Sequence, residues 1–201
     1  MSADAHPQPH RHFVLYKPCG YLSQFVNNGP KKGRKRLLGE LGTFPVGTMA
    51  VGRLDEQSEG LLLLTTDGKT SQLICSGRVE KEYYAQVDGM ITGEAVAKLS
   101  QGVEIGIHGR KYMTKPCTVS AIPGEPDYPP GRAIRDARHG PVSWVSITLR
   151  EGKFRQIRKM TAAAGFPTLR LLRVRIGCIR LDGMGVGESF ETGDLLERLG
   201  L

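Results

Sequence analysis

The hydrophobic and polar positions along the chain predict short strands separated by turns rich in glycine and proline. Runs of aliphatic, aromatic and β-branched residues with the length of a strand occupy residues 12–17, 47–51, 61–66, 82–87, 111–122 and 144–150. In one of these runs Pro116 predicts an edge strand or a bulge, because proline cannot donate to a strand ladder. Residues 168–177 alternate imperfectly between aliphatic residues and arginines, so we expect a strand with one basic, solvent-facing surface.

Four consecutive leucines, Leu61 to Leu64, belong to one of these runs. They show neither the two-residue period of a half-exposed strand nor the stripe of an amphipathic helix. Such a composition is typical of a strand in a sheet that is covered on both faces. We therefore expect the leucines to be buried on both sides and to anchor the polar turn that precedes them.

Three segments are predicted to be helical, and each has a recognisable boundary. Asp67 and Thr92 are expected to cap the first two, since their side-chain oxygens can accept from the free amides of a first turn. Gly165 and Pro167 end the third. The predicted helices cover residues 69–76, 92–100 and 152–165.

The third predicted helix has two faces of different character. The face expected to pack against the rest of the protein consists of Phe154, Ile157, Thr161 and Ala164. The face expected to present positive charge carries Arg155, Arg158 and Lys159.

Strands and helices are interspersed along the chain, which predicts an α+β fold with a mixed, largely antiparallel sheet. We expect one domain over residues 12–201, after a mobile N-terminal tail at residues 1–11. Residues 123–142 are rich in proline and charge, and we expect a long loop there.

The charge of the chain is unbalanced and concentrated. Lys and Arg number 28 against 20 Asp and Glu, which gives a formal net charge of +8. One basic cluster lies at residues 31–36, and a second runs from Arg150 to Arg180, with Glu151 as its only acid. Concentrated positive charge binds phosphate by releasing counterions, so we expect a polyanionic partner. The alternative is that each basic cluster is only a solvated face.

Other features exclude several classes of protein. The four cysteines form no C-x-x-C pair, so they indicate neither a zinc ribbon nor a thioredoxin-type site, and we expect reduced thiols. No apolar window has the length of a membrane span, and the N-terminus does not resemble a signal peptide. We expect a cytoplasmic protein with no membrane partner and no metal site, despite the histidines at positions 6, 10 and 12.

Two motifs near residue 50 suggest chemistry. Gly47 and Gly52 have the spacing of a phosphate-binding loop, but Arg53 and Leu54 occupy the positions where that loop needs Lys and Ser or Thr, so nucleotide binding is rejected. Three carboxylates then follow within five residues, at Asp55, Glu56 and Glu59. A pair of carboxylates can cleave a glycosidic bond, whereas a polar turn with solvated acids is the simpler interpretation.

Four motifs in order resemble those of the RNA pseudouridine synthases of the RsuA family. Residues 51–68, VGRLDEQSEGLLLLTTDG, resemble the GRLD-x-x-S-E-G-L-L motif. The K-P-x-G element matches residues 17–20, the K-x-Y element matches residues 81–83, and the E-G-x-x-R-Q-[IV]-R-[RK]-M element matches residues 151–160. The resemblance covers residues 12–181 and implies the catalytic fold of that family.

Most members of this family carry an S4 RNA-binding module before the K-P-x-G element, but only sixteen residues precede it here. With Pro129-Pro130, Ser143-Trp144 and residues 165–171, this makes the chain most similar to members that act on the large ribosomal subunit. The resemblance implies that a specific uridine of 23S ribosomal RNA is isomerised to pseudouridine without a cofactor.

The resemblance also implies roles for individual residues. Asp55 is the expected nucleophile, with attack on the sugar or on the base both left open, and Arg158 is expected to pair with it. Tyr83 is expected to stack on the uracil, and Arg53 to fill the space that the flipped base leaves. The other residues expected to bind RNA are Lys17, Lys153, Arg155, Lys159, Arg170 and Arg173.

Two rival functions share some of these features. A ribosome-associated RNA-binding protein without catalysis would have the same basic faces, and an N-glycosidase would use the same carboxylates but release free uracil. We expect the protein to be a monomer, and its expected partner is large-subunit ribosomal RNA.

Overall fold

The computed structural model describes residues 9–27, 35–131 and 137–201. Most of the predicted N-terminal tail, the basic residues Lys31, Lys32 and Arg34, and residues 132–136 of the predicted loop lie outside these ranges. Arg11, which the prediction placed in the mobile tail, is held by an ion pair between its guanidinium and Glu191 at 2.6 Å.

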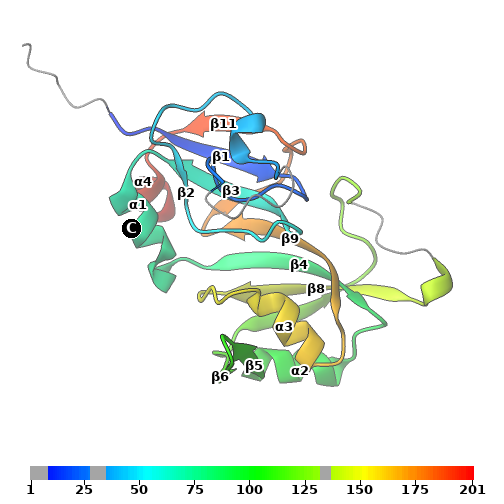
Figure 1. The fold of residues 1–201 in the computed structure, drawn as a ribbon. Coiled ribbons are helices and arrows are strands. Elements are labelled where there is room, and N and C mark those ends of the chain that lie inside the picture. Colours follow the sequence, from blue (N-terminus) through cyan, green and yellow to red (C-terminus); the bar gives the residue numbers. More distant parts are fainter. Residues whose placement is uncertain (1–8, 28–34, 132–136) are drawn as a thin grey trace, which may run out of the picture.

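Nine strands of the described residues form one sheet, with β11-β1-β3-β9-β4-β8-β7 in spatial order (Figure 1). The strands of its main path are β1 (His12–Lys17), β3 (Glu59–Thr65), β4 (Lys81–Asp88), β7 (Thr118–Ile122), β8 (Val142–Leu149), β9 (Thr168–Ile176) and β11 (Ser189–Thr192). Two short strands, β2 (Met49–Ala50) and β10 (Ile179–Arg180), pair with β3 and β9. Among these strands, only β3 and β9 run parallel, which confirms the mixed, largely antiparallel sheet.

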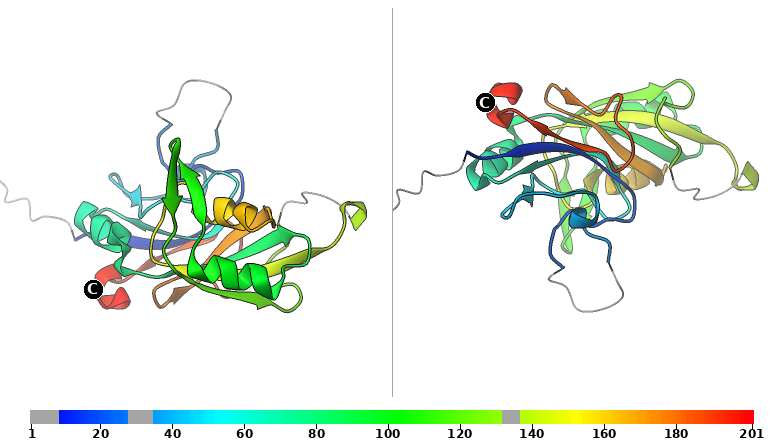
Figure 2. Two further views of the ribbon diagram at one scale, coloured as in Figure 1. Left: turned by 90° about the horizontal axis from the view of Figure 1, so that it is seen from below. Right: turned by 90° about the horizontal axis from the view of Figure 1, so that it is seen from above.

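The helices and a separate hairpin cover this sheet. The helices are α1 (Gly68–Leu73), α2 (Gly93–Gln101), α3 (Gln156–Ala163) and α4 (Leu195–Leu199). A π-helical turn, Ile74–Arg78, follows α1. The hairpin consists of β5 (Glu104–Ile107) and β6 (Arg110–Met113). Figure 2 shows that α3, this hairpin and the chain around residues 20–27 rise from the same face of the sheet.

The leucine run lies in the middle of the sheet, as predicted. Leu61 and Leu63 belong to one core cluster and Leu62 and Leu64 to another, and all four side chains are fully buried. Alternate residues of a strand point to opposite faces, so β3 is covered on both sides. This position fixes the turn that enters β3 from residue 58.

Several predicted boundaries need correction. The predicted strand at residues 111–122 is two strands, β6 and β7, with Pro116 between them, and β7 is an edge strand. The caps at Asp67 and Thr92 are confirmed, with bonds to the amides of Lys69 and Ala95. The strands β5, β10 and β11 and the helix α4 were not predicted.

The expected basic surface on residues 168–177 is wrong. Arg170 and Arg173 are buried, because β9 lies between β3 and β4 in the interior of the sheet. Helix α3 also begins later than predicted, at Gln156, because Arg155 has a left-handed backbone with φ of 52°. Phe154 therefore lies outside the helix and is exposed, whereas Ile157 and Thr161 are buried as predicted.

No helix in the described part of the chain is both long enough and apolar enough to cross a membrane.

Candidate active site

Asp55 lies in the turn that joins β2 to β3, and every carbonyl of residues 54–58 in this turn is hydrogen-bonded. The Asp55 carbonyl accepts from the Ser58 amide at 3.0 Å, within the turn. The other four carbonyls accept from groups outside it. Their donors are the Ser23 hydroxyl to Leu54 (2.8 Å), the Gly20 amide to Glu56 (2.7 Å), the Arg158 guanidinium to Gln57 (2.8 Å) and the Lys17 ammonium to Ser58 (2.8 Å). A turn held at each peptide keeps the Asp55 side chain in one place.

Lys17 contacts this turn from the protein interior. Its side chain is completely buried, and its ammonium donates to the carbonyls of Pro18 (2.9 Å) and Ser58 (2.8 Å). Burial lowers the pKa of Lys17 to about 8, because an apolar surrounding disfavours the charged form. Lys17 is therefore inaccessible to RNA, and the predicted phosphate contact is replaced by contacts within the protein.

The ion pair of Asp55 differs from the prediction. The Nη1 atom of Arg155 lies 3.4 Å from the Asp55 carboxylate. Arg158 instead donates to the carbonyl of Gln57 at 2.8 Å and to that of Thr168 at 3.2 Å. Direct pairing of Arg158 with Asp55 is therefore wrong for this structure. The left-handed conformation of Arg155 turns its side chain out of the helix and toward the turn. Arg158 instead fixes the peptide two residues after Asp55.

Tyr83 comes to the site from β4, which is separated from β3 by β9. The ring is nearly buried, and the guanidinium of Arg173 lies 5.9 Å from its centroid. A cation at this distance from an aromatic ring is attracted to the face of the ring. Arg173 also donates from Nε to the carbonyl of Leu61 at 2.7 Å, so it connects β9 to β3.

Arg170 and Glu59 form a buried ion pair under the same turn. Nε of Arg170 lies 2.6 Å from Oε1 of Glu59, and both side chains are at most 8% exposed. A second nitrogen of Arg170 donates to the carbonyl of Pro129 at 2.7 Å. The predicted RNA contacts of Arg170 and Arg173 are thus replaced by structural ones. Arg170 is bonded through two nitrogens, whereas Nη2 of Arg173 is buried without a hydrogen-bond partner among the described residues.

A cavity of about 590 Å³ opens above Asp55. Apolar walls come from Leu54, Leu149, Ile157 and Leu171, and Tyr83 and Arg155 also face it. Three acidic residues of the described chain line the cavity, and among them Asp55 has no contact shorter than 3.4 Å to another described side chain. Glu56 pairs with Lys35 at 2.9 Å, and Glu151 accepts three hydrogen bonds.

The remaining predicted RNA-binding residues are all accessible. Arg53 is exposed at the mouth of the cavity and donates to the side chain of Gln24. Lys153 is exposed, and its ammonium lies 5.0 Å from the centroid of the Tyr112 ring. Lys159 is half-buried and donates to the carbonyl of Gly106 at 2.7 Å.

The sequence interpretation assigned no role to Glu151, although the residue begins a recognised motif. Its carboxylate accepts from the Tyr112 hydroxyl (2.6 Å), the Lys115 amide (2.9 Å) and the Gln156 side chain (2.6 Å). These bonds connect β6, the turn after it and the first residue of α3. They hold the segment that carries Arg155.

In the part of the chain that the structure describes, no group of three or more His, Cys, Asp and Glu side chains is arranged to hold a metal ion. The four cysteines are free.

Comparisons with known proteins identify the family. The model of the family "RNA pseudouridylate synthase" matches residues 11–163. Ribosomal large subunit pseudouridine synthase E of Xanthomonas axonopodis pv. citri (strain 306) is 39% identical over 174 residues, which cover 85% of this chain and 88% of that protein. The same-named protein of Vibrio parahaemolyticus serotype O3:K6 (strain RIMD 2210633) is 37% identical over 177 residues, covering 87% of this chain and 71% of that protein.

A solved structure supports the same assignment. The crystal structure of a pseudouridylate synthase superposes with a TM-score of 0.73 at 26% identity, covering 96% of this chain and 74% of that one. The resemblance predicted from four sequence motifs is confirmed, as is the α+β catalytic fold that it implied. The chain belongs to the RNA pseudouridylate synthase family.

Proposed function

We propose that this protein isomerises a specific uridine of 23S ribosomal RNA to pseudouridine, with the carboxylate of Asp55 as nucleophile and without a cofactor. The large subunit is proposed because both relatives carry that subunit in their names. The observation that carries the assignment of the nucleophile is the state of the cavity acids. Glu56 and Glu151 are engaged in short contacts, whereas within the described residues the ionic contact of Asp55 is at 3.4 Å.

The reaction breaks the N1–C1′ bond of the uridine and forms a bond from C5 to C1′. C5 loses a proton and N1 gains one, so the composition of the RNA does not change. The target nucleotide must first leave its stack, which costs a few kcal/mol. The apolar walls of the cavity and the ring of Tyr83 provide a surface on which the uracil stacks and is held while it turns.

The other residues serve this chemistry from defined positions. Arg155 orients Asp55, because its Nη1 lies 3.4 Å from the carboxylate. Arg158 acts as a positioning residue through the carbonyl of Gln57. Arg53, at the mouth of the cavity, occupies the space that the flipped base leaves. Lys153 and Lys159 contribute positive charge for RNA phosphates.

Chemical labelling of pseudouridine in 23S ribosomal RNA tests this proposal. In vitro transcribed 23S RNA is incubated with the protein, derivatised with a carbodiimide and read by primer extension. We expect one new carbodiimide-dependent stop. Free uracil with an abasic site would instead show an N-glycosidase, and RNA that is bound but unchanged would show a binding protein. Either result would overturn the proposed function.

A further inference from the structure

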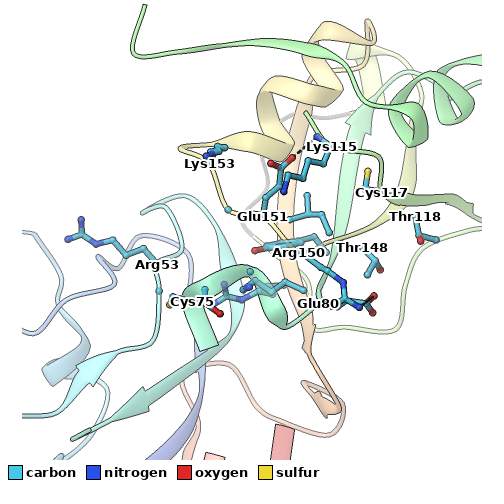
Figure 3. Close-up of a pocket in the computed structure, with 18 of the residues that line it drawn as sticks. Arg53, Cys75, Glu80, Lys115, Cys117, Thr118, Thr148, Arg150, Glu151 and Lys153 are labelled. Atoms are coloured by element: carbon cyan, nitrogen blue, oxygen red, sulfur yellow. Dashed lines mark hydrogen bonds and ion pairs between the residues drawn. The ribbon is translucent and has the colours of Figure 1, made fainter. Parts of the chain in front are cut away.

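A second cavity adjoins the one that contains Asp55 (Figure 3). Its volume is about 880 Å³, and Tyr83, Leu149 and Lys153 line both cavities. Its walls come from the π-helical turn after α1, from β4 and β8, and from the turn between β6 and β7. The residue proposed to stack on the uracil therefore separates the reaction site from a larger space beside it.

Both carboxylates of this second cavity are already engaged by other groups of the protein. Glu80 lies 3.1 Å from Arg150 and 3.7 Å from Arg175. Glu151 accepts hydrogen bonds from Tyr112, Gln156 and the amide of Lys115, as described above. The donors to Glu151 are neutral groups, so its charge remains, but basic side chains outnumber acidic ones in the lining of the cavity.

Two lysines of the cavity are by contrast uncommitted. Lys115 is exposed, and within the described residues its ammonium has no hydrogen-bonding or ion-pair partner. Among the described residues, the ammonium of Lys153 has no hydrogen bond or ion pair; it lies 5.0 Å from the centroid of the Tyr112 ring and interacts with the charge of Glu151 at longer range. Figure 3 shows both lysines on the side of the cavity where Glu151 lies, with Glu80 and Cys75 across from them. A cleft lined by charges of one sign concentrates their field and attracts the opposite charge.

We propose that this second cavity binds a phosphodiester next to the target uridine, with Lys115 and Lys153 as the phosphate-contacting side chains. The proposal rests on the proposed function, since it takes the Asp55 cavity as the place of the target base. A ribonucleotide chain that delivers one base to Tyr83 has to continue past its ring. The second cavity lies beside this ring, and the ammonium groups of Lys115 and Lys153 on flexible side chains can bind a phosphate there.

Lysine acetylation of the wild-type protein is the first test. The protein is treated with an acetylating reagent with and without in vitro transcribed 23S RNA, and the modified lysines are quantified by mass spectrometry. We expect RNA to reduce acetylation of Lys115 and Lys153 several-fold. Lys111 lies on β6, four residues before Lys115, and its side chain is 83% exposed and paired with Glu104, so it serves as the unprotected reference.

A pair of variants is the second test. Lys115→Gln and Lys111→Gln remove the same charge from neighbouring positions. For Lys115→Gln we expect KM to rise about fivefold at low salt, with kcat unchanged. The slope of log Kd against log salt concentration should fall in magnitude by about 1, which corresponds to the loss of one phosphate contact. Lys111→Gln should match wild type in both measurements, because Lys111 does not line the cavity and is paired with Glu104.

The outcomes separate this proposal from the function on which it rests. Unprotected Lys115, or equal KM values for the two variants, would overturn the phosphate site even if pseudouridine forms. Protection of Lys115 without pseudouridine in the RNA would overturn the proposed function and support the cavity as an RNA site.

Discussion

Lys17 is a charged residue with no exposure to solvent, and its two carbonyl partners belong to the segments on either side of the site. In the folded protein, burial lowers the pKa of this ammonium from 10.5 to about 8. Between these values the unfolded chain binds more protons than the folded chain. The contribution of Lys17 to the free energy of unfolding therefore rises with pH in this range.

Lys17→Met removes this dependence while keeping a side chain of similar length. We expect the stability of wild type relative to Lys17→Met to increase by up to about 1.4 kcal/mol per pH unit between about pH 8 and about pH 10. Urea unfolding of both proteins at a series of pH values measures the difference. Other titrating groups are common to both proteins and cancel. A difference that does not change with pH would contradict the role given to Lys17.

Arg158 acts through a carbonyl of the turn and not through the carboxylate. Arg158→Lys keeps the charge but cannot reach the carbonyls of Gln57 and Thr168 with the planar fork of a guanidinium. We expect kcat to fall by about tenfold or more, with RNA affinity within about twofold of wild type. Arg11→Lys, in an exposed pair with Glu191, is the matched control and should retain full activity. Near-normal turnover of Arg158→Lys would contradict this positioning role.

At the scale of elements, the close approach of β3 and β9 sets the position of Asp55. Gly60 has φ of 104°, and a Cβ built on it would lie 2.4 Å from the carbonyl oxygen and 2.8 Å from the amide nitrogen of Arg173. Both contacts are to main chain of the parallel pair, which cannot move without separating the strands. This is the feature that makes a glycine necessary directly after Glu59.

Gly60→Ala should therefore destabilise the protein by more than about 2 kcal/mol and reduce activity, because β3 carries the turn of Asp55. The matched control is Gly68→Ala in the first turn of α1, where an added Cβ meets no atom within 4 Å. Denaturant unfolding of the two variants gives the comparison. Equal stabilities would show that the strand contact does not constrain the site.

The elements also show which features sequence patterns can predict. The leucine run and the helix caps are local, and they are confirmed. The exposure assigned to Arg170 and Arg173 is wrong, because alternation within residues 168–177 does not reveal that β9 lies between β3 and β4. The partner of Asp55 was missed for a similar reason. One left-handed residue, Arg155, starts α3 later than helical spacing predicts.

For the molecule as a whole, motifs distant in the sequence converge on one face of the sheet. Residues 17–23 and 54–58 meet the segment from Glu151 to Ile157, and Tyr83 comes from β4 between them. The order of the motifs predicts this family and its fold. The engagement of Glu56, Glu59 and Glu151 in other contacts emerges only from the folded chain, and it leaves one carboxylate for the chemistry.

The net charge of +8 is also a property of the whole molecule, but its cations are divided between buried and accessible positions. Buried cations such as Lys17, Arg170 and Arg173 bind groups of the sheet and of the turn of Asp55. Accessible residues such as Lys115 and Lys153 are the ones we propose to attract RNA. Basic composition thus predicts a polyanionic partner without showing which cations contact it.

The central claim is that Asp55 alone carries the chemistry, and the most direct measurement is pseudouridine formation in 23S ribosomal RNA by Asp55→Asn. The amide keeps the shape of the side chain but is not a nucleophile. We predict no detectable pseudouridine, with RNA affinity and the free energy of unfolding close to those of wild type. Appreciable turnover by a folded, RNA-binding Asp55→Asn protein would contradict the account.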